Sequence, residues 1–259
     1  MNYVFYDFET SGNNKDFDQI LQIGAVLTDE GFHIKDKINI SCRLKKNIIP
    51  APEALLINRI SIDQLQSNKI THYELLEQLR KKFEEWSPAC FVGFNSISFD
   101  EDVLRQGLFQ SFNFPYLTSV KGNCRLDVLK LARAVSAFAP NSIAIPLGKD
   151  NKPSFKLGNL TKVNQVTHDN AHDAMGDVVA TLELAKKIES VEMTEILSLG
   201  KSLELVKDIG DATVVANQYG LNNFNGTHGI GHTRMATESG VDIRSVSYTH
   251  LTLPTILLV

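Results

Sequence analysis

Two acidic residues near the start of the chain, Asp7 and Glu9, are separated by a single phenylalanine in an apolar stretch. On a β-strand, residues i and i+2 point to the same face, so these carboxylates would stand about 7 Å apart. An exposed strand face would tolerate such a pair, and a lone D-x-E motif is weak evidence of a site. The apolar neighbours, however, indicate a buried strand, where unpaired acids are costly. A divalent cation, which prefers oxygen ligands, would remove that cost.

A third acid, Asp100, follows an apolar run of strand type at 90–95 and precedes a helical pattern. Aspartate is a favoured helix N-cap, and for this residue alone a cap is the simpler interpretation. Its place at a strand-to-helix junction also makes it a candidate partner of the first two acids.

His172 and Asp177 stand at the start of the clearest helical pattern in the chain, at 171–189. Five residues span about 1.4 turns of a helix, so the imidazole and the carboxylate could face one cavity. A capped helix with both side chains in solvent explains this pair equally well when it is taken alone.

The elements that must position these residues follow from periodicity. Apolar and alternating runs predict strands at 3–9, 19–28, 33–44 and 90–95. Helical spacing predicts helices at 72–86, 100–112, 125–138 and 171–189. Three successive strands with short polar connections indicate an antiparallel meander. We therefore expect an α/β protein with a mixed sheet flanked by helices.

The composition excludes several classes of protein. With 43% hydrophobic residues, 259 residues can form a sizeable core. The N-terminus lacks the pattern of a secretion signal, and no segment has the apolar length of a membrane span. Three widely spaced cysteines argue against a disulfide framework or a structural zinc site and favour buried thiols in a reducing cytoplasm: Cys42, Cys90 and Cys124.

The formal net charge is −4, so no overall positive field would draw this chain to nucleic acid. Any polynucleotide contact must therefore be local. Basic residues gather in the middle of the chain, where they form either a phosphate-binding surface or an ordinary solvated face: Lys121, Arg125, Lys130, Arg133, Lys152, Lys156 and Lys162.

The three acidic motifs are far more specific together than singly. In this order, D-x-E-T, N-x-x-x-F-D and H-D-A-x-x-D resemble the DEDD exonuclease superfamily, in the subgroup that uses histidine. Four longer segments, at 93–103, 125–134, 153–164 and 170–181, are similar to the bacterial exonuclease I family, which degrades single-stranded DNA from the 3′ end. The resemblance covers residues 1–190 and implies a catalytic domain with a ribonuclease H-like sheet.

The resemblance implies a metal-dependent phosphodiester hydrolase. Four carboxylates would hold two Mg²⁺ ions, for which Mn²⁺ could substitute: Asp7, Glu9, Asp100 and Asp177. His172 would take the proton from the attacking water. The products would be nucleoside 5′-monophosphates.

The resemblance also implies contacts to the 3′ end of single-stranded DNA. Lys156 would contact a substrate phosphate, Glu9 would contact the substrate as well as metal, and Arg105 is a weaker candidate. Stacking of bases on aromatic side chains is a usual aid to single-strand binding. For Phe8 and Phe99, beside the acidic residues, core packing is the expected role. We expect a monomer.

Residues 191–259 differ from the rest, because they are rich in Gly, Asn and Thr and lack a sustained apolar period. The segment from about 195 to 243 resembles a fragment of a class II glutamine amidotransferase, with its motif at 229–239, in which Arg234 would bind the glutamine carboxylate. That activity requires an N-terminal cysteine, and this chain starts Met-Asn-Tyr, so we do not expect it.

The last residues, V-S-Y-T-H-L-T-L-P-T and beyond, resemble translated sequencing-adapter text. We interpret 191–259 as an irregular, chimeric extension, with a natural fusion as the alternative. In the exonuclease I family further domains follow the catalytic domain, and residues 191–259 do not resemble them. We therefore expect a distributive enzyme whose affinity for DNA is weak and salt-sensitive.

Two other functions stay open. An RNA-trimming or oligoribonucleotide exonuclease of the same superfamily would use the same metal site, since only a contact to the 2′-hydroxyl distinguishes the two sugars. A non-catalytic nucleic-acid-binding module would bind without releasing nucleotides. The filled site positions disfavour that module.

Overall fold

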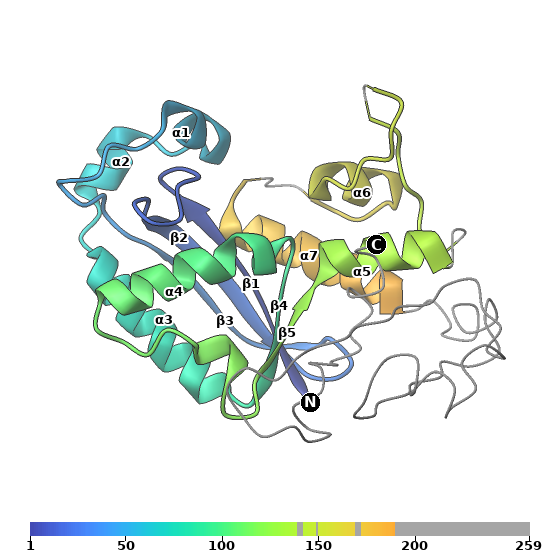
Figure 1. The fold of residues 1–259 in the computed structure, drawn as a ribbon, viewed down its shortest axis with the longest axis horizontal. Coiled ribbons are helices and arrows are strands. Elements are labelled where there is room, and N and C mark those ends of the chain that lie inside the picture. The colour runs from blue at the N-terminus through green and yellow to red at the C-terminus, as the bar shows by residue number, and fades with distance from the viewer. Residues whose placement is uncertain (139–141, 149, 169–171, 190–259) are drawn as a thin grey trace, which may run out of the picture.

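A mixed five-stranded sheet lies at the centre of the protein (Figure 1). The computed structural model describes residues 1–138, 142–148, 150–168 and 172–189, so the predictions for 191–259 lie outside the described residues. The strands are β1 (Asn2–Thr10), β2 (Ile20–Thr28), β3 (Ile34–Ser41), β4 (Ala89–Gly93) and β5 (Cys124–Asp127). Their spatial order is β3-β2-β1-β4-β5. The strands β1, β2 and β3 form an antiparallel meander, while β4 and β5 run parallel to β1, which confirms the predicted mixed sheet.

Helices cover both faces of this sheet (Figure 1). The α-helices are α1 (Pro52–Asn58), α2 (Ile62–Ser67), α3 (His72–Trp86), α4 (Asp100–Gln110), α5 (Val128–Phe138), α6 (Leu157–Val163) and α7 (Ala174–Glu189), and the short 3-10 helices are η1 (Ser96–Ser98) and η2 (Leu117–Ser119). Helices α3 and α4 pack on one face, and α5 and α7 pack on the other. Among the described residues, no helix combines the length and the apolar character that crossing a membrane requires.

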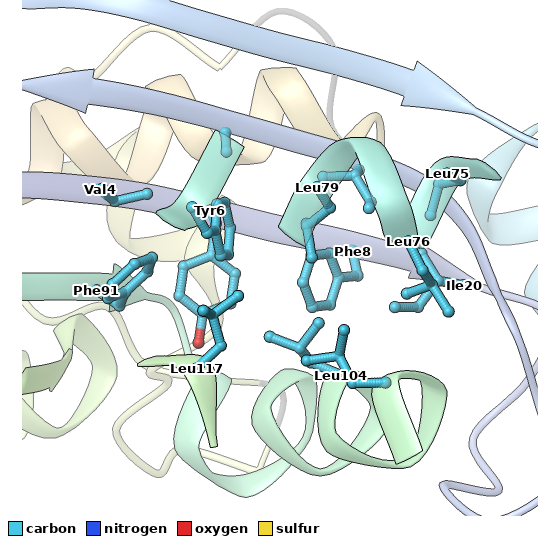
Figure 2. Close-up of a cluster of buried hydrophobic side chains, with 14 of the residues drawn as sticks. Val4, Tyr6, Phe8, Ile20, Leu75, Leu76, Leu79, Phe91, Leu104 and Leu117 are labelled. Carbon is cyan, nitrogen blue, oxygen red and sulfur yellow. The ribbon is translucent and has the colours of Figure 1, made fainter. Parts of the chain in front are cut away.

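The alternation of side chains along β1 decides where its acids point. Every second residue from Val4 to Phe8 packs into the cluster beneath α3 and α4, which Figure 2 shows in close-up. Phe5 has the opposite parity and packs with α5 and α7. Asp7 and Glu9 share the parity of Phe5, so both carboxylates belong to the α7 face of the sheet.

The helix α3 shows how the chain defines one of its own elements. Thr71 and Glu74 form a reciprocal capping box, which satisfies amide donors that would otherwise lack partners at the start of the helix. The apolar residues at helical spacing are all buried: Leu75, Leu76, Leu79, Phe83 and Trp86. Phe8 packs in the same cluster and Phe99 lies partly buried against it, so both have the core-packing role expected for them.

Three predictions were wrong in detail. The segment predicted as a helix at 125–138 begins inside β5, because this edge strand gains ladder hydrogen bonds from β4 that local helical spacing does not reveal. The last helix begins at Ala174 rather than at 171, because Asp173 caps it. Cys42 and Cys90 are buried thiols, but Cys124 is exposed, since it is the first residue of the edge strand.

Candidate active site

Three carboxylates from two elements meet at one place on the α7 face. Asp7 and Glu9 of β1 and Asp177 of α7 offer oxygen atoms that all lie within 4.8 Å of one another. Glu9 is only 7% exposed, and the Asp177 side chain is 16% exposed. The structure therefore brings together acids that are 170 residues apart in the chain.

A glycine on the neighbouring strand permits this approach. Gly24 of β2 lies opposite Asp7 in the antiparallel ladder. A Cβ atom at this position would lie 2.6 Å from the backbone carbon of Ala174, at the start of α7. Only a residue without a side chain lets the first turn of α7 pack so closely on the sheet, and that turn carries Asp177.

Asp100 reaches the cluster from the other side of β1. The ladder between β1 and β4 ends at the Phe5–Val92 pair, which leaves the β1 backbone beyond it open on that side. There the Phe8 amide donates to Asp100 Oδ1 at 3.3 Å. Asp100 is 5% exposed and is the first residue of α4, whereas the cap position belongs to Phe99 and has no side-chain cap. The capping role that seemed simplest for Asp100 alone is therefore wrong.

Three acids of the cluster, Asp7, Glu9 and Asp100, have a raised pKa. Burial raises the pKa of Asp7 well above its ordinary value, and the charges of Asp100 and Asp177 raise it further. The pKa of Glu9 rises to about 7, first because the group is buried and then because of Asp177 and Asp173. Burial is also the main reason that the pKa of Asp100 rises to about 8. Bound cations would neutralise this repulsion, and a set of carboxylate oxygens suits a hard divalent ion.

His172 lies just outside α7. It is solvent-exposed with a left-handed φ of 66°, and its backbone N–H donates to Asp177 Oδ1 at 3.3 Å. The side chain of Asp173 accepts a hydrogen bond from the Gly176 amide at 3.1 Å and caps the helix, which begins at the next residue, Ala174. His172 therefore precedes the helix that carries Asp177, and the proton-accepting role of its imidazole stays a prediction.

A second histidine, which sequence reasoning missed, contacts the cluster directly. His168 Nε2 lies 2.5 Å from Asp177 Oδ1, and the His168 side chain is only 10% exposed. The segment before α7 has no apolar period, so no pattern could place this side chain. The one available signal was a second imidazole four residues before His172.

The two basic residues predicted to bind substrate lie elsewhere. Lys156 is exposed at the N-cap position of α6. Arg105 pairs with Glu101 at 3.6 Å and Asp102 at 3.5 Å, and its guanidinium lies over the Tyr116 ring. Among the hydrogen bonds and ion pairs of the described residues, neither basic group contacts the acidic cluster. Their roles toward substrate stay predictions.

A buried acid that sequence reasoning missed, Glu101, holds the elements around the site together through hydrogen bonds. Glu101 is 1% exposed and accepts hydrogen bonds from Tyr6 Oη at 2.6 Å, Thr118 Oγ1 at 2.7 Å and Arg125 Nη1 at 3.2 Å. These bonds tie α4 to β1, η2 and β5. Because Asp100 is the neighbour of Glu101 and Asp7 is the neighbour of Tyr6, the network fixes two acids of the site relative to each other.

Comparison with known proteins gives a family and a fold for this chain. The RNase_T family model, described as Exonuclease, matches residues 4–185. Exodeoxyribonuclease I of Haemophilus influenzae is 35% identical over 189 residues, which cover 72% of this chain and 40% of that protein. The crystal structure of E. coli Exonuclease I in complex with a dT13 oligonucleotide superposes with a TM-score of 0.71 at 30% identity, over 76% of this chain and 42% of that one.

Two further likenesses are to a zinc-bound structure and to a protein of another family. The zinc-ion-bound form of the E. coli ExoI–ssDNA complex matches with a TM-score of 0.70 at 31% identity, over 76% of this chain and 42% of that one. A candidate glutamine amidotransferase of Methanothermobacter thermautotrophicus is 41% identical over 59 residues, which are 23% of this chain and 19% of that protein. The chain spans about two-fifths of the length of the exodeoxyribonucleases that it matches.

Proposed function

Because the chain belongs to the RNase_T exonuclease family, we propose that it is a metal-dependent 3′→5′ exonuclease that degrades single-stranded DNA to nucleoside 5′-monophosphates. The observation that carries this proposal is the convergence of four acids from β1, α4 and α7 around residues 7–9 of β1. The resemblance to exodeoxyribonuclease I, including a structure in complex with a dT13 oligonucleotide, supports single-stranded DNA as the substrate.

The acidic residues fit a pair of divalent cations, for which we propose Mg²⁺ with Mn²⁺ as a substitute. Asp7, Glu9 and Asp177 present oxygen atoms close enough to share one ion. Asp100 influences the pKa of Asp7 and would complete the site from α4. The raised pKa of Asp7, Glu9 and Asp100 supports the assignment, because buried carboxylates that repel one another are stabilised by a bound cation.

The chemistry we propose is hydrolysis of the terminal phosphodiester. When bound, the cations supply Lewis-acid activation of the attacking water and stabilise the departing 3′-oxygen. The water oxygen forms a bond to phosphorus and the bond from phosphorus to the 3′-oxygen breaks, so a nucleoside 5′-monophosphate leaves. The 3′-oxygen of the shortened strand takes up a proton from solvent and becomes the new 3′-hydroxyl. His172 takes the proton from the water, because its exposed position beside Asp177 lets it exchange that proton with solvent.

The remaining parts of the proposal concern the substrate and the setting. Lys156, and more weakly Arg105, would contact substrate phosphates, and Glu9 would contact the terminal nucleotide as well as metal.

We further propose a cytoplasmic monomer, to be checked by size-exclusion chromatography and cell fractionation. We propose that 191–259 takes no part in catalysis and is chimeric. An unbroken read of codons 185–259 in the source genome would contradict the chimera.

The proposal is tested with one oligonucleotide labelled at either end. With Mg²⁺, a 3′-label should leave as a mononucleotide at once, while a 5′-label should shorten through a ladder of intermediates, as a distributive enzyme gives. EDTA and Asp7→Asn, which keeps the shape of the side chain, should each stop release. An RNA oligomer of the same sequence should be cut more slowly.

Each arm tests a separate part of the proposal. Nucleotide release in EDTA would contradict the metal-dependent mechanism. An active Asp7→Asn variant would contradict the assignment of the active site. Faster cleavage of RNA would replace the DNA substrate by RNA. Binding of the oligomer without any nucleotide release would indicate a non-catalytic module.

A further inference from the structure

The histidine that contacts Asp177 has no part in the mechanism above. We propose that His168 is a positioning residue, whose Nε2–H holds the Asp177 carboxylate in the orientation that binds the cation. The inference rests on the proposed exonuclease function and assigns a role within the same site. His172 remains the residue that handles the proton.

The His168–Asp177 hydrogen bond is short and largely buried, and its donor can be assigned. His168 Nε2 and Asp177 Oδ1 are 2.5 Å apart, with 10% and 16% of the two side chains exposed. An ionised carboxylate can only accept, so the imidazole must carry its hydrogen on Nε2 in this bond. The other ring nitrogen, Nδ1, lies 3.4 Å from Thr161 Oγ1 in α6, and that hydroxyl donates at a shorter distance, 3.0 Å, to the Leu157 carbonyl. The bond therefore fixes the tautomer of His168.

His168 is held in place by the segment that precedes it. The Val166 amide donates to the Thr161 carbonyl at 2.8 Å, which turns the chain back toward α6. The Asn164 side chain bonds both the amide and the carbonyl oxygen of Ala144, at 2.9 and 2.8 Å. An imidazole on such a tethered segment loses little freedom when it bonds Asp177, so it can impose an orientation on the carboxylate.

The arrangement of donors around Asp177 leaves one oxygen for a cation. Oδ1 receives both His168 Nε2–H and the His172 backbone N–H. In the part of the chain that the structure describes, no hydrogen bond is made to Oδ2. With Oδ1 fixed by donors, the carboxylate cannot rotate freely about its side-chain bond, and it keeps its place beside Asp7 and Glu9. Hydrogen bonds of this kind to a metal-binding carboxylate typically change affinity by about 10- to 100-fold.

The test measures Mn²⁺ binding to the full chain by isothermal titration calorimetry without DNA. His168→Leu removes the donor, His168→Gln places an amide donor near the position of Nε2, and His168→Asn carries the same amide on a shorter stem. We expect the leucine and asparagine variants to bind Mn²⁺ about 10- to 100-fold more weakly than wild type. We expect the glutamine variant to stay within about threefold of wild type, because it keeps the hydrogen bond.

The outcomes separate this inference from the proposed function. Wild-type affinity in His168→Leu and His168→Asn would overturn the positioning role, and so would a glutamine variant as weak as leucine. A wild-type chain that binds no Mn²⁺ would overturn the proposed function and this inference with it. Thermal unfolding in EDTA checks each fold, and if the leucine variant does not fold, the asparagine and glutamine pair still decides the question.

Nuclease assays distinguish the two histidines. For His168→Leu, the Mg²⁺ concentration that gives half the maximal rate should rise about 10- to 100-fold, while saturating Mg²⁺ restores most of the rate. For His172→Ala, that concentration should stay unchanged while the maximal rate falls. A loss of maximal rate in His168→Leu that Mg²⁺ does not restore would contradict a role exerted through the metal.

Discussion

Replacing Glu9 with glutamine should stabilise the metal-free protein at alkaline pH. The folded protein raises the pKa of Glu9 from 4.5 to about 7, chiefly by burial. At about 1.4 kcal/mol for each pH unit between these values, ionised Glu9 costs the folded state about 3.5 kcal/mol. This is an upper bound, because other acids of the cluster can take up the proton instead. Glutamine has nearly the same shape and cannot ionise, so it avoids the cost.

The sign of the effect sets the pH window. Below pH 4.5 Glu9 is protonated in both the folded and the unfolded chain, and the substitution should change little. Between pH 4.5 and about 7 the unfolded chain releases this proton while the folded chain keeps it, so the free energy of unfolding of the wild type falls as pH rises. Above pH 7 the full difference between wild type and Glu9→Gln should be reached.

Urea denaturation in EDTA measures this difference. Glu9→Gln should exceed wild type by about 2 to 3 kcal/mol at pH 8 and by less than about 1 kcal/mol at pH 5. The exposed Glu53 in the first turn of α1 offers a matched control, and Glu53→Gln should change stability by less than about 1 kcal/mol at either pH. Adding Mg²⁺ should stabilise the wild type more than Glu9→Gln. Equal stability of the two proteins at pH 8 in EDTA would refute the argument that burial and the neighbouring charges make ionised Glu9 unfavourable in the folded protein.

Three further predictions follow from single contacts. Gly24→Ala should cost about 1 to 3 kcal/mol and reduce Mg²⁺-dependent activity, because its Cβ would press on the start of α7. Glu101→Gln should lower the free energy of unfolding in urea by about 2 to 4 kcal/mol, because a glutamine cannot accept all the donors that converge there. His172→Ala should leave Mn²⁺ affinity unchanged and slow single-turnover nucleotide release by about two to four orders of magnitude.

Each of these predictions has its own control and its own contrary result. Gly158→Ala, in α6 with nothing within 4 Å of the new Cβ, should cost nothing or gain up to about 1 kcal/mol, and an equal loss in Gly24→Ala and Gly158→Ala would argue against a local clash. Wild-type stability of Glu101→Gln would mean that its hydrogen bonds are redundant. An unaltered rate in His172→Ala would transfer the proton-accepting role to another group.

Local periodicity was enough to predict most of the fold. The alternation of residues along β1 correctly predicted that Asp7 and Glu9 share a face of the sheet. The helical spacing of apolar residues in α3 identified the buried side of that helix. These features depend on residues that are near one another in sequence, so a pattern can reveal them. The strand β5 was missed because its four residues become a strand only through pairing with β4, more than thirty residues earlier.

The sequence indicated which acids belong to the candidate site, but it did not indicate the contacts that support them. Asp7, Asp100 and Asp177 carry their own motifs, but His168 meets Asp177 through a segment with no periodic pattern. Glu101 lies in a helical stretch among other charged residues, where an acid usually faces solvent. It is buried because donors from distant elements reach it, and no local pattern contains that information.

The most direct test of the cation site is anomalous diffraction from crystals soaked in Mn²⁺. We predict peaks between the carboxylates of Asp7, Glu9, Asp100 and Asp177, at about 2 to 2.3 Å from their oxygen atoms, with no comparable peak elsewhere on the catalytic domain. Mn²⁺ bound only at other positions, or one of these four side chains turned away from the others, would contradict the account.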